Sequence, residues 1–152
     1  MPTHREIRAA IAAVMETVDG IGIVHGRERY LKRAADLEAL FLSDGRIRGW
    51  VIRLATTRRT RPTLGRYIVT HRWQIRGYMG FDDADASELL FDDLVEDLQA
   101  AFKADETLGG TVAATVLPDD LAGLQRDDSG PVMFSGVLCH SARLNLATQH
   151  YE

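Results

Sequence analysis

The sequence predicts an α+β domain with a mostly antiparallel sheet of four or more strands and two main amphipathic helices packed on one face of it. Two segments carry apolar residues at helical spacing, one near the N-terminus and one between residues 83 and 104. Other segments are rich in β-branched and aromatic residues, and one of them alternates apolar and polar side chains. The length of 152 residues fits a single domain over residues 1–152.

The first helix is expected to follow Thr3, which forms a capping-box pattern with Glu6, and to stop at Gly20. Its apolar face is predicted to contain Ile7, Ala10, Ile11, Val14, Met15 and Val18. A short strand from Ile21 to Val24 and a second short helix from Lys32 to Leu42 are expected next.

Two strands are predicted from Arg46 to Thr57 and from Arg66 to Met79, joined by a long exposed hairpin tip from Thr57 to Gly65. In the second strand the odd positions are apolar: Tyr67, Val69, Trp73, Ile75 and Met79. Its even positions are polar: Arg66, Thr70, Arg72, Gln74 and Arg76. A period of two places these sets on opposite faces of the sheet, so the arginine face meets water or a partner.

The second strong helix is predicted from about Asp83 to Ala104, with Asp82, Asp83 or Asp85 as its cap. Its buried stripe is predicted to contain Leu90, Phe91, Leu94, Val95, Leu98, Ala101 and Phe102. Its other face carries Asp92, Asp93, Glu96 and Asp97, which form like-charge pairs four residues apart. We expect cations from elsewhere in the subunit or from a neighbouring subunit to pair with these acids. The alternative is that the acidic face only keeps the protein soluble.

A short strand from Thr111 to Leu117 and an exposed acidic loop from Pro118 to Gly130 are expected after the helix. The segment from Val132 to Tyr151 alternates apolar and polar residues and is long for one strand. We therefore expect two strands or one kinked strand, with the bend at Gly136.

The charges are strongly segregated, although the net charge is only −4. The segment from Arg46 to Arg76 has no acid and nine arginines, namely Arg46, Arg48, Arg53, Arg58, Arg59, Arg61, Arg66, Arg72 and Arg76. The segment from Phe81 to Asp128 has fourteen acids and two bases. Such a bipolar subunit is suited to binding copies of itself or a charged partner. Arg58, Arg59 and Arg61 crowd one predicted tip, where they would contact an acidic protein face or nucleic-acid phosphate, or remain solvated.

No pattern of a catalytic, cofactor or metal site is present, so the sequence favours an assembly protein over an enzyme. The five histidines form no H-x-x-x-H pair, and the single Cys139 cannot build a C-x-x-C site. Strand alternation places Cys139 and His140 on opposite faces, and His140 is expected to be a hydrogen-bonded core residue. Asp119, Asp120, Asp127 and Asp128 lack the spacing of a calcium loop. No secretory signal or membrane-spanning apolar run is seen, and one cysteine suits a reducing cytoplasm.

The order of these elements resembles the tail terminator (tail completion) proteins of long-tailed phages (siphophages) and phage-like particles. The residues that carry the resemblance are the Ile7–Ile11 helix, the Gly22–His25 turn into a strand, the Trp50-x-Ile52 and Trp73-x-Ile75 strands, the acidic Leu89–Phe102 helix and the Val137–Leu144 strand. The resemblance covers nearly the whole chain but rests on order and spacing.

The resemblance implies a small α+β subunit that forms a hexameric ring, caps the finished tail tube, stops its polymerisation and joins it to the head connector. It implies a homo-oligomer whose partners are the tail tube protein and the head–tail connector protein, with DNA passing through the ring lumen. It implies no cofactor, no membrane and no catalytic residue, with assembly in the host cytoplasm and a final place at the neck end of the virion tail. The candidate interface is Arg58, Arg59, Arg61, Arg66, Arg72, Arg76, Asp92, Asp93, Glu96 and Asp97.

Three alternatives stay open, and the least supported is a small enzyme that uses an unrecognised site. One is another head–tail neck protein of the same kind of particle. Another is a nucleic-acid-binding module that uses the Arg46–Arg76 sheet, with Trp73 or Tyr67 for base stacking.

Overall fold

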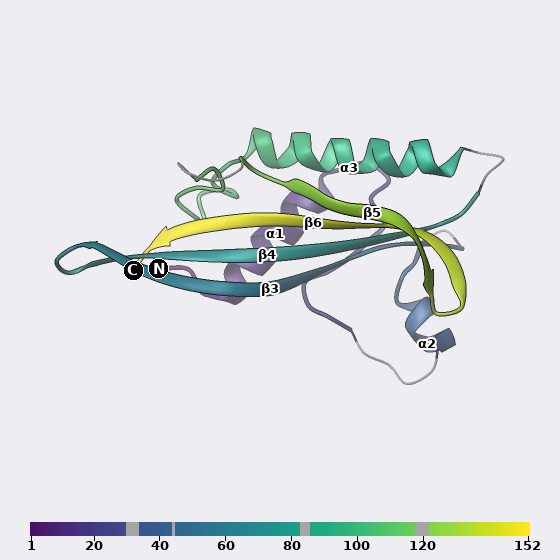
Figure 1. Ribbon diagram of the computed structural model, residues 1–152, viewed down its shortest axis with the longest axis horizontal. Helices are drawn as coiled ribbons and strands as arrows, with labels where there is room; N and C mark the ends of the chain where they lie inside the picture. Colours follow the sequence, from purple (N-terminus) through teal and green to yellow (C-terminus); the bar gives the residue numbers. More distant parts are fainter. Residues whose placement is uncertain (30–33, 44, 83–85, 118–121) are drawn as a thin grey trace.

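A computed structural model shows an elongated α+β molecule in which long, twisted strands run along the longest axis (Figure 1). The structure describes residues 1–29, 34–43, 45–82, 86–117 and 122–152. Among these residues a mixed six-stranded sheet has the order β1-β3-β4-β6-β5, with β2 paired to β3 outside this path. The α+β prediction with a mostly antiparallel sheet is confirmed.

Two long hairpins make most of the sheet. In the first, β3 (Arg46–Thr63) pairs with β4 (Arg66–Gly80), and in the second, β5 (Gln125–Phe134) pairs with β6 (Val137–Tyr151). β6 joins the hairpins by pairing antiparallel to β4 from Ile68↔Tyr151 to Gly80↔Cys139. The short β1 (Ile23–His25) is the only parallel partner among the described strands, and β2 (Leu42–Ser43) adds two residues beside the start of β3.

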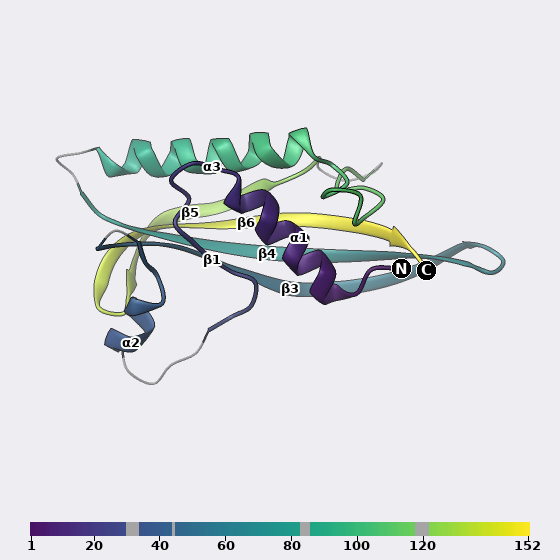
Figure 2. The ribbon, with the colours of Figure 1, turned by 180° about the vertical axis from the view of Figure 1, so that it is seen from behind.

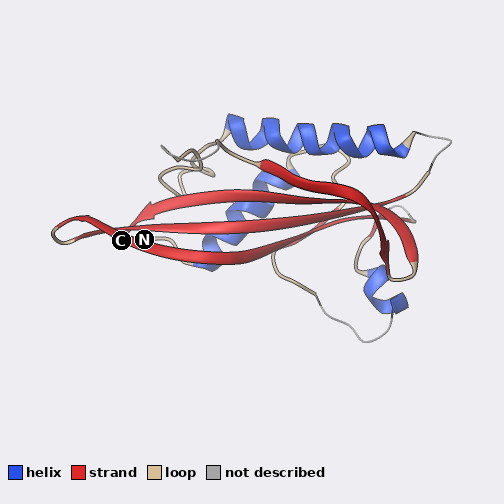
Figure 3. Cartoon of the chain, in the orientation of Figure 1, coloured by secondary structure: helices blue, strands red, loops and turns tan. Residues whose placement is uncertain are grey.

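Three helices are described: α1 (His4–Glu16), α2 (Ala34–Ala39) and α3 (Ser87–Ala104). Viewed from behind, α1 crosses the strands obliquely, whereas α3 runs along the β5–β6 side (Figure 2). Figure 3 shows the same helices and strands from the front, coloured by secondary structure. The stronger expectation, that two main helices pack on one face, is not confirmed. The short helix that was predicted from Lys32 to Leu42 corresponds to α2, although residues 32 and 33 lie outside the described part of the chain.

The main core is one buried cluster to which residues of α1, α3 and the long strands contribute. Apolar residues at helical spacing in α1 and α3 are buried in one cluster with strand residues, namely Ile7, Ile11, Met15, Trp50, Ile52, Trp73, Ile75, Phe91, Val95, Leu98, Phe102, Leu144 and Leu146. The alternation predicted for β4 is confirmed, because Val69, Trp73, Ile75 and Met79 are buried while Arg66, Arg72 and Arg76 are exposed. Only Tyr67 departs from it, since its side chain is 39% exposed.

A second, smaller core lies on the opposite side of the sheet, at the end where α2 packs. It buries Phe41, Ile47, Val51 and Cys139, with Tyr78 and Phe134 against them. Cys139 and His140 therefore point to opposite faces, as predicted, and burial raises the pKa of the Cys139 thiol.

Several boundaries differ from the prediction. The predicted hairpin tip from Thr57 is instead a continuation of β3 to Thr63, with the turn at Leu64 and Gly65. The expectation of a loop from Pro118 to Gly130 is wrong, because the residues from Gln125 onward form the edge strand β5. Residues 118–121, including Asp119 and Asp120, lie outside the described residues. The segment from Thr111 to Leu117 forms isolated bridges rather than a strand. The bend at Gly136 is confirmed as the turn between β5 and β6.

The start of α3 also differs from the prediction. Its N-cap is Ala86, which has a φ of 51° and makes no side-chain capping bond, whereas Asp82 lies before the helix and Asp83 and Asp85 lie outside the described residues. Ser87 closes this corner, since its amide donates to the Asp82 carbonyl at 3.1 Å. Leu90, predicted to be buried, is 47% exposed, because the buried stripe runs instead through Ser87, Phe91 and Val95.

No helix in the described residues is long and apolar enough to cross a membrane.

Candidate assembly surfaces

The β3–β4 hairpin continues past the rest of the sheet as an arm, which we define as residues 58–67. It extends beyond the two chain termini at one end of the molecule (Figure 1). Every residue of the arm is exposed, and the turn residue Leu64 is 88% exposed. The strand pairing of β4 with β6 ends at Ile68, and beyond it the Glu152 amide donates to the Tyr67 carbonyl at 2.9 Å, so the rest of the arm is paired only through its own two strands.

The arginines of the arm differ in how their charges are held within the subunit. Arg59 forms an ion pair with the side chain of Glu152 at 2.9 Å, and the Arg66 guanidinium lies 4.3 Å from the centre of the Tyr151 ring. Arg61 lies over the Tyr67 ring at 6.0 Å but has no acidic partner. Arg58 makes no contact of either kind with the described residues. The arm therefore exposes two guanidinium groups, Arg58 and Arg61, that are free to pair with acids outside the subunit.

A buried histidine pair lies at the root of the arm, where β3, β4 and β6 meet. His71 and His150 have ring centres 5.4 Å apart, and Nδ1 of His71 is hydrogen-bonded to the Thr57 hydroxyl at 2.8 Å. Burial lowers the pKa of His71, and the nearby positive charges of His150, Arg59 and His4 lower it further. Burial also lowers the pKa of His150, against the opposing effect of the Glu152 carboxylate. Burial and these neighbouring charges therefore favour the neutral form of the His71 ring, and burial favours the neutral form of the His150 ring.

The predicted arginine face of the sheet is present and is wider than the sequence indicated. Arg72 and Arg76 are exposed on β4, and Arg76 lies 4.0 Å from Glu28. The exposed Arg143 of β6 stands opposite Arg76 in the register, and Asp128 of β5 stands opposite Arg143. Sequence reasoning missed Arg143, because the order of the strands, which brings it beside β4, is not encoded in any local pattern.

The predicted acidic face of α3 is also present, and one of its charges is neutralised within the subunit. Asp92 forms an ion pair with Arg126 of β5 at 2.8 Å. Asp93, Glu96 and Asp97 are exposed and make no ion pair with the described residues. Arg126 is therefore a cation of the kind expected to pair with the acidic face of α3, but its ion pair is with Asp92 alone among the described residues.

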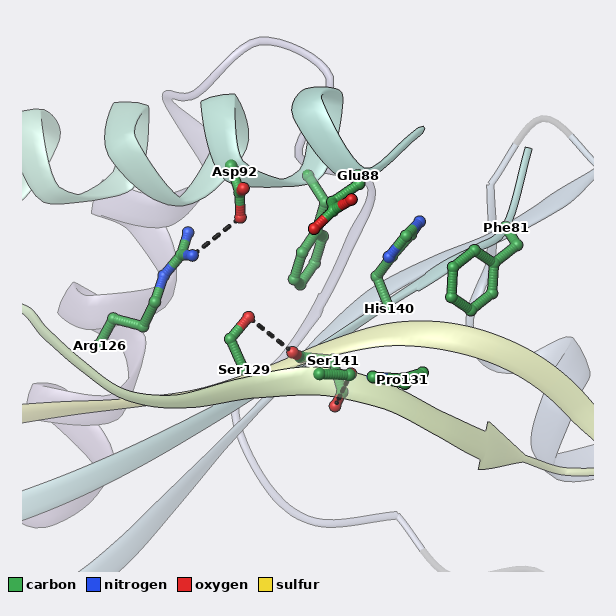
Figure 4. Close-up of a pocket in the computed structure, with 10 residues that line it drawn as sticks. Phe81, Glu88, Asp92, Arg126, Ser129, Pro131, His140 and Ser141 are labelled. Carbon is green, nitrogen blue, oxygen red and sulfur yellow. Dashed lines mark hydrogen bonds and ion pairs between the residues drawn. The ribbon is translucent and has the colours of Figure 1, made fainter. Parts of the chain in front are cut away.

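An open cleft of about 420 Å³ separates the first two turns of α3 from β5 and β6 (Figure 4). Its walls carry Phe81, Glu88, Phe91, Asp92, Arg126, Ser129, Gly130, Pro131, His140 and Ser141. Asp92 and Arg126 bridge it at one end, whereas Glu88 has no ion-pair partner among the described residues.

His140, on the wall of this cleft, is the hydrogen-bonded core histidine that the sequence predicted. Its Nε2 is 2.7 Å from the hydroxyl of Ser87, and its ring contacts Phe81 and Phe91. The Ser87 hydroxyl also accepts a hydrogen bond from the Asp82 amide at 2.8 Å. The pair ties α3 to β6, and no hydrogen bond from it to a carboxylate is seen among the described residues.

The ten candidate residues occupy three separate places rather than one site: the arm, the outer sheet face and α3. Within the described residues, no ion pair joins an arginine of the Arg46–Arg76 tract to an acid of α3. The described residues also contain no group of three or more His, Cys, Asp or Glu side chains that could hold a metal ion.

No family model matches this chain, and no curated protein matches it. The inference of function therefore depends on the geometry and the charges of the molecule.

Proposed function

We propose that this protein is a tail terminator of a long-tailed phage or phage-like particle, a structural protein that forms a ring. In this proposal the ring is a hexamer that assembles in the host cytoplasm, caps the tail tube, stops its polymerisation and joins it to the head–tail connector. Its place is then the neck end of the virion tail, with DNA passing through the ring lumen. The proposed role requires no catalytic residue and no cofactor.

One observation supports this proposal above the others: opposite charges that form no ion pair with the described residues stand at different places on one subunit. Arg58 and Arg61 lie on the arm, whereas Glu88, Asp93, Glu96 and Asp97 lie on α3. A contact between two different surfaces of identical copies is heterologous, and it produces a ring when its rotation closes. The segregation of charge thus supports head-to-tail self-assembly.

The layering of the fold supports the same proposal. We propose that α1 and α3 cover one face of the sheet, since their buried residues share one cluster with Trp50, Trp73 and Leu144. The other face, with Arg72, Arg76 and Arg143, is then available to the tail tube, the connector or the DNA in the lumen.

The solution mass tests the ring. We expect light scattering at low salt to give a species of about six copies, and we expect added salt to dissociate it, since exposed ion pairs are screened over roughly 10 Å at 0.1 M salt. Adding the protein to polymerising tail tube protein should shorten the tubes. A protein that neither forms rings nor stops tube growth contradicts the proposal. A ring that binds the connector but leaves tube growth unchanged indicates another neck protein.

A nucleic-acid-binding module is the second candidate, because the exposed Tyr67 stands beside Arg61 on the arm. Trp73, the other aromatic residue considered for stacking, is fully buried and donates its indole N–H to Thr148 at 2.9 Å. Single-stranded DNA should bind this protein strongly, with a steep salt dependence, only if this second candidate is correct.

A further inference from the structure

The arm and the α3 cleft lie at opposite ends of the molecule. β4 runs about 50 Å from the arm to the end at which α3 begins. The two views agree that the arm points away from that end (Figures 1 and 2). Because the arm is a paired hairpin, it cannot fold back to the cleft of its own subunit. Any contact between them joins two copies.

The charges of the two surfaces are opposite in sign. Arg58 and Arg61 are about 10 Å apart along β3 and point to opposite faces of the arm, since Arg58 stands opposite Thr70 and Arg61 lies over Tyr67. Glu88, Asp92 and Glu96 follow one another at four-residue steps, so they form a stripe along one side of α3. The middle acid is already held by Arg126, and the two outer acids, about 12 Å apart, have no partner among the described residues.

The apolar groups next to these charges also match. The arm ends in Leu64, which is 88% exposed, and the cleft is bordered by Phe81, which is 42% exposed. Leu89, beside Glu88, is 64% exposed. Two exposed apolar ends become covered if they pack together, which removes unfavourable contact with water.

We propose that the arm of one copy lies in the α3 cleft of the next copy. In this contact the free edge of β3 faces α3, so that Arg61 from one face of the arm pairs with Glu88, Arg58 from the other face pairs with Glu96, and Leu64 packs against Phe81. The inference rests on the proposed self-assembly and adds to it the two surfaces that meet. It assigns the partner of the arm as a second copy of this chain rather than nucleic acid.

The test uses two full-length variants that reverse opposite sides of the contact. One carries Arg58→Glu and Arg61→Glu, and the other carries Glu88→Arg and Glu96→Arg. Each variant alone places like charges in the contact, so its self-association should weaken by about tenfold or more. An equal mixture should associate as the unchanged protein does, because every contact between unlike variants then joins opposite charges. A chain with all four reversals should also associate.

Matched controls separate this contact from a general effect of charge. Arg27→Glu reverses an exposed arginine of the loop after β1, and Glu16→Arg reverses an exposed acid at the end of α1. These two changes should leave the mass nearly unchanged, and their mixture should show no recovery. Urea unfolding of every variant verifies that the monomer is folded, and nuclease treatment removes bridging by nucleic acid.

The outcomes distinguish this contact from the proposed function. If the charge-reversed variants still form salt-sensitive rings, the contact is wrong but the proposed ring is not contradicted. The same holds if the unchanged protein forms rings and mixing the two reversed variants does not restore their association. An unchanged protein that stays monomeric at every concentration also overturns the contact, and tube capping then tests the terminator role separately. Restoration in the mixture with the mass of a dimer supports the contact as a reciprocal exchange of arms and contradicts the hexamer.

Discussion

Gly77 lies directly beneath Trp50, and this contact makes the glycine necessary. A Cβ atom at this position would lie 2.2 Å from the Trp50 ring. The ring cannot move aside, because it is fully buried, donates its indole N–H to the Ile21 carbonyl at 2.8 Å and stacks on Phe91. Even the methyl side chain of alanine would therefore overpack the core at this point.

We expect Gly77→Ala to lower the free energy of unfolding by about 2–3 kcal/mol, which is within the range for overpacked cores. Urea unfolding measures the change. Gly130→Ala is the matched control, since it also lies in a strand but a Cβ there would meet nothing within 4 Å. Equal effects of the two substitutions would contradict the packing argument and indicate a general cost of replacing strand glycines.

The histidine pair at the root of the arm should make stability depend on pH. Because burial lowers the pKa of His71 and His150 in the folded state, the unfolded chain binds protons first, at a pKa near 6.5. The stability that these neutral rings contribute is complete above this value and is lost as the pH falls from 6.5 toward 5. Arg59, His4 and the N-terminus disfavour protonation of the pair, whereas Glu152 favours it at His150.

Urea midpoints measured at pH 7.5, 6.5, 5.5 and 5.0 test this dependence. The double variant His71→Asn and His150→Asn should show a flatter profile over this range, whereas His4→Asn should keep most of the slope. A double variant with the slope of the unchanged protein would assign the pH dependence to other groups.

At the scale of elements, α1 depends on the capping box that the sequence predicted. The Thr3 hydroxyl accepts from the Glu6 amide at 3.2 Å, and the Glu6 carboxylate accepts from the Thr3 amide at 2.6 Å. Thr3→Ala should therefore cost about 1 kcal/mol of stability, measured by urea unfolding. Thr3→Ser keeps the hydroxyl and should cost much less. An equally destabilised serine variant would show that the methyl group matters and the cap does not.

Elements with local signals were predictable from the sequence, and those that depend on distant pairing were not. The cap of α1 and the alternation of β4 arise from neighbouring residues. β3 beyond Thr57 is exposed on both faces, so its polar sequence carries no burial period that separates a strand from a loop. β5 is an edge strand that contains Asp127, Asp128 and Pro131, residues that edges tolerate and that sequence reading assigns to loops.

The candidate site divides in the same way. The exposure of Arg66 followed from strand alternation, and the exposure of Asp93, Glu96 and Asp97 followed from helical spacing. The ion pair of Arg126 with Asp92, and the cleft beside it, depend on β5 packing next to α3, which no local pattern encodes.

At the scale of the whole molecule, the arm adds length without adding to the core. Residues 55–63 are all exposed, and the main core ends near Trp73 and Leu146, well before the turn at Leu64 and Gly65. A segment that contributes so little burial is retained in a fold more readily for binding than for stability.

Shortening the arm separates these two roles. Arg59 and Val69 are directly paired, so replacing residues 60–68 by Asn-Gly closes the hairpin with a two-residue turn. We expect the shortened chain to keep its fold, with a urea midpoint close to that of the full chain, because no fully buried residue is removed. Its self-association should fall to the level of the arm-reversed variant or below, since Arg61 and Leu64 are lost. A matched variant that keeps the arm and replaces only Leu64 by Ser should lose less of its self-association than the shortened chain does. If the shortened chain still forms rings, self-assembly depends on the outer sheet face rather than on the arm. If the shortened chain is unfolded, the arm contributes to the stability of the fold.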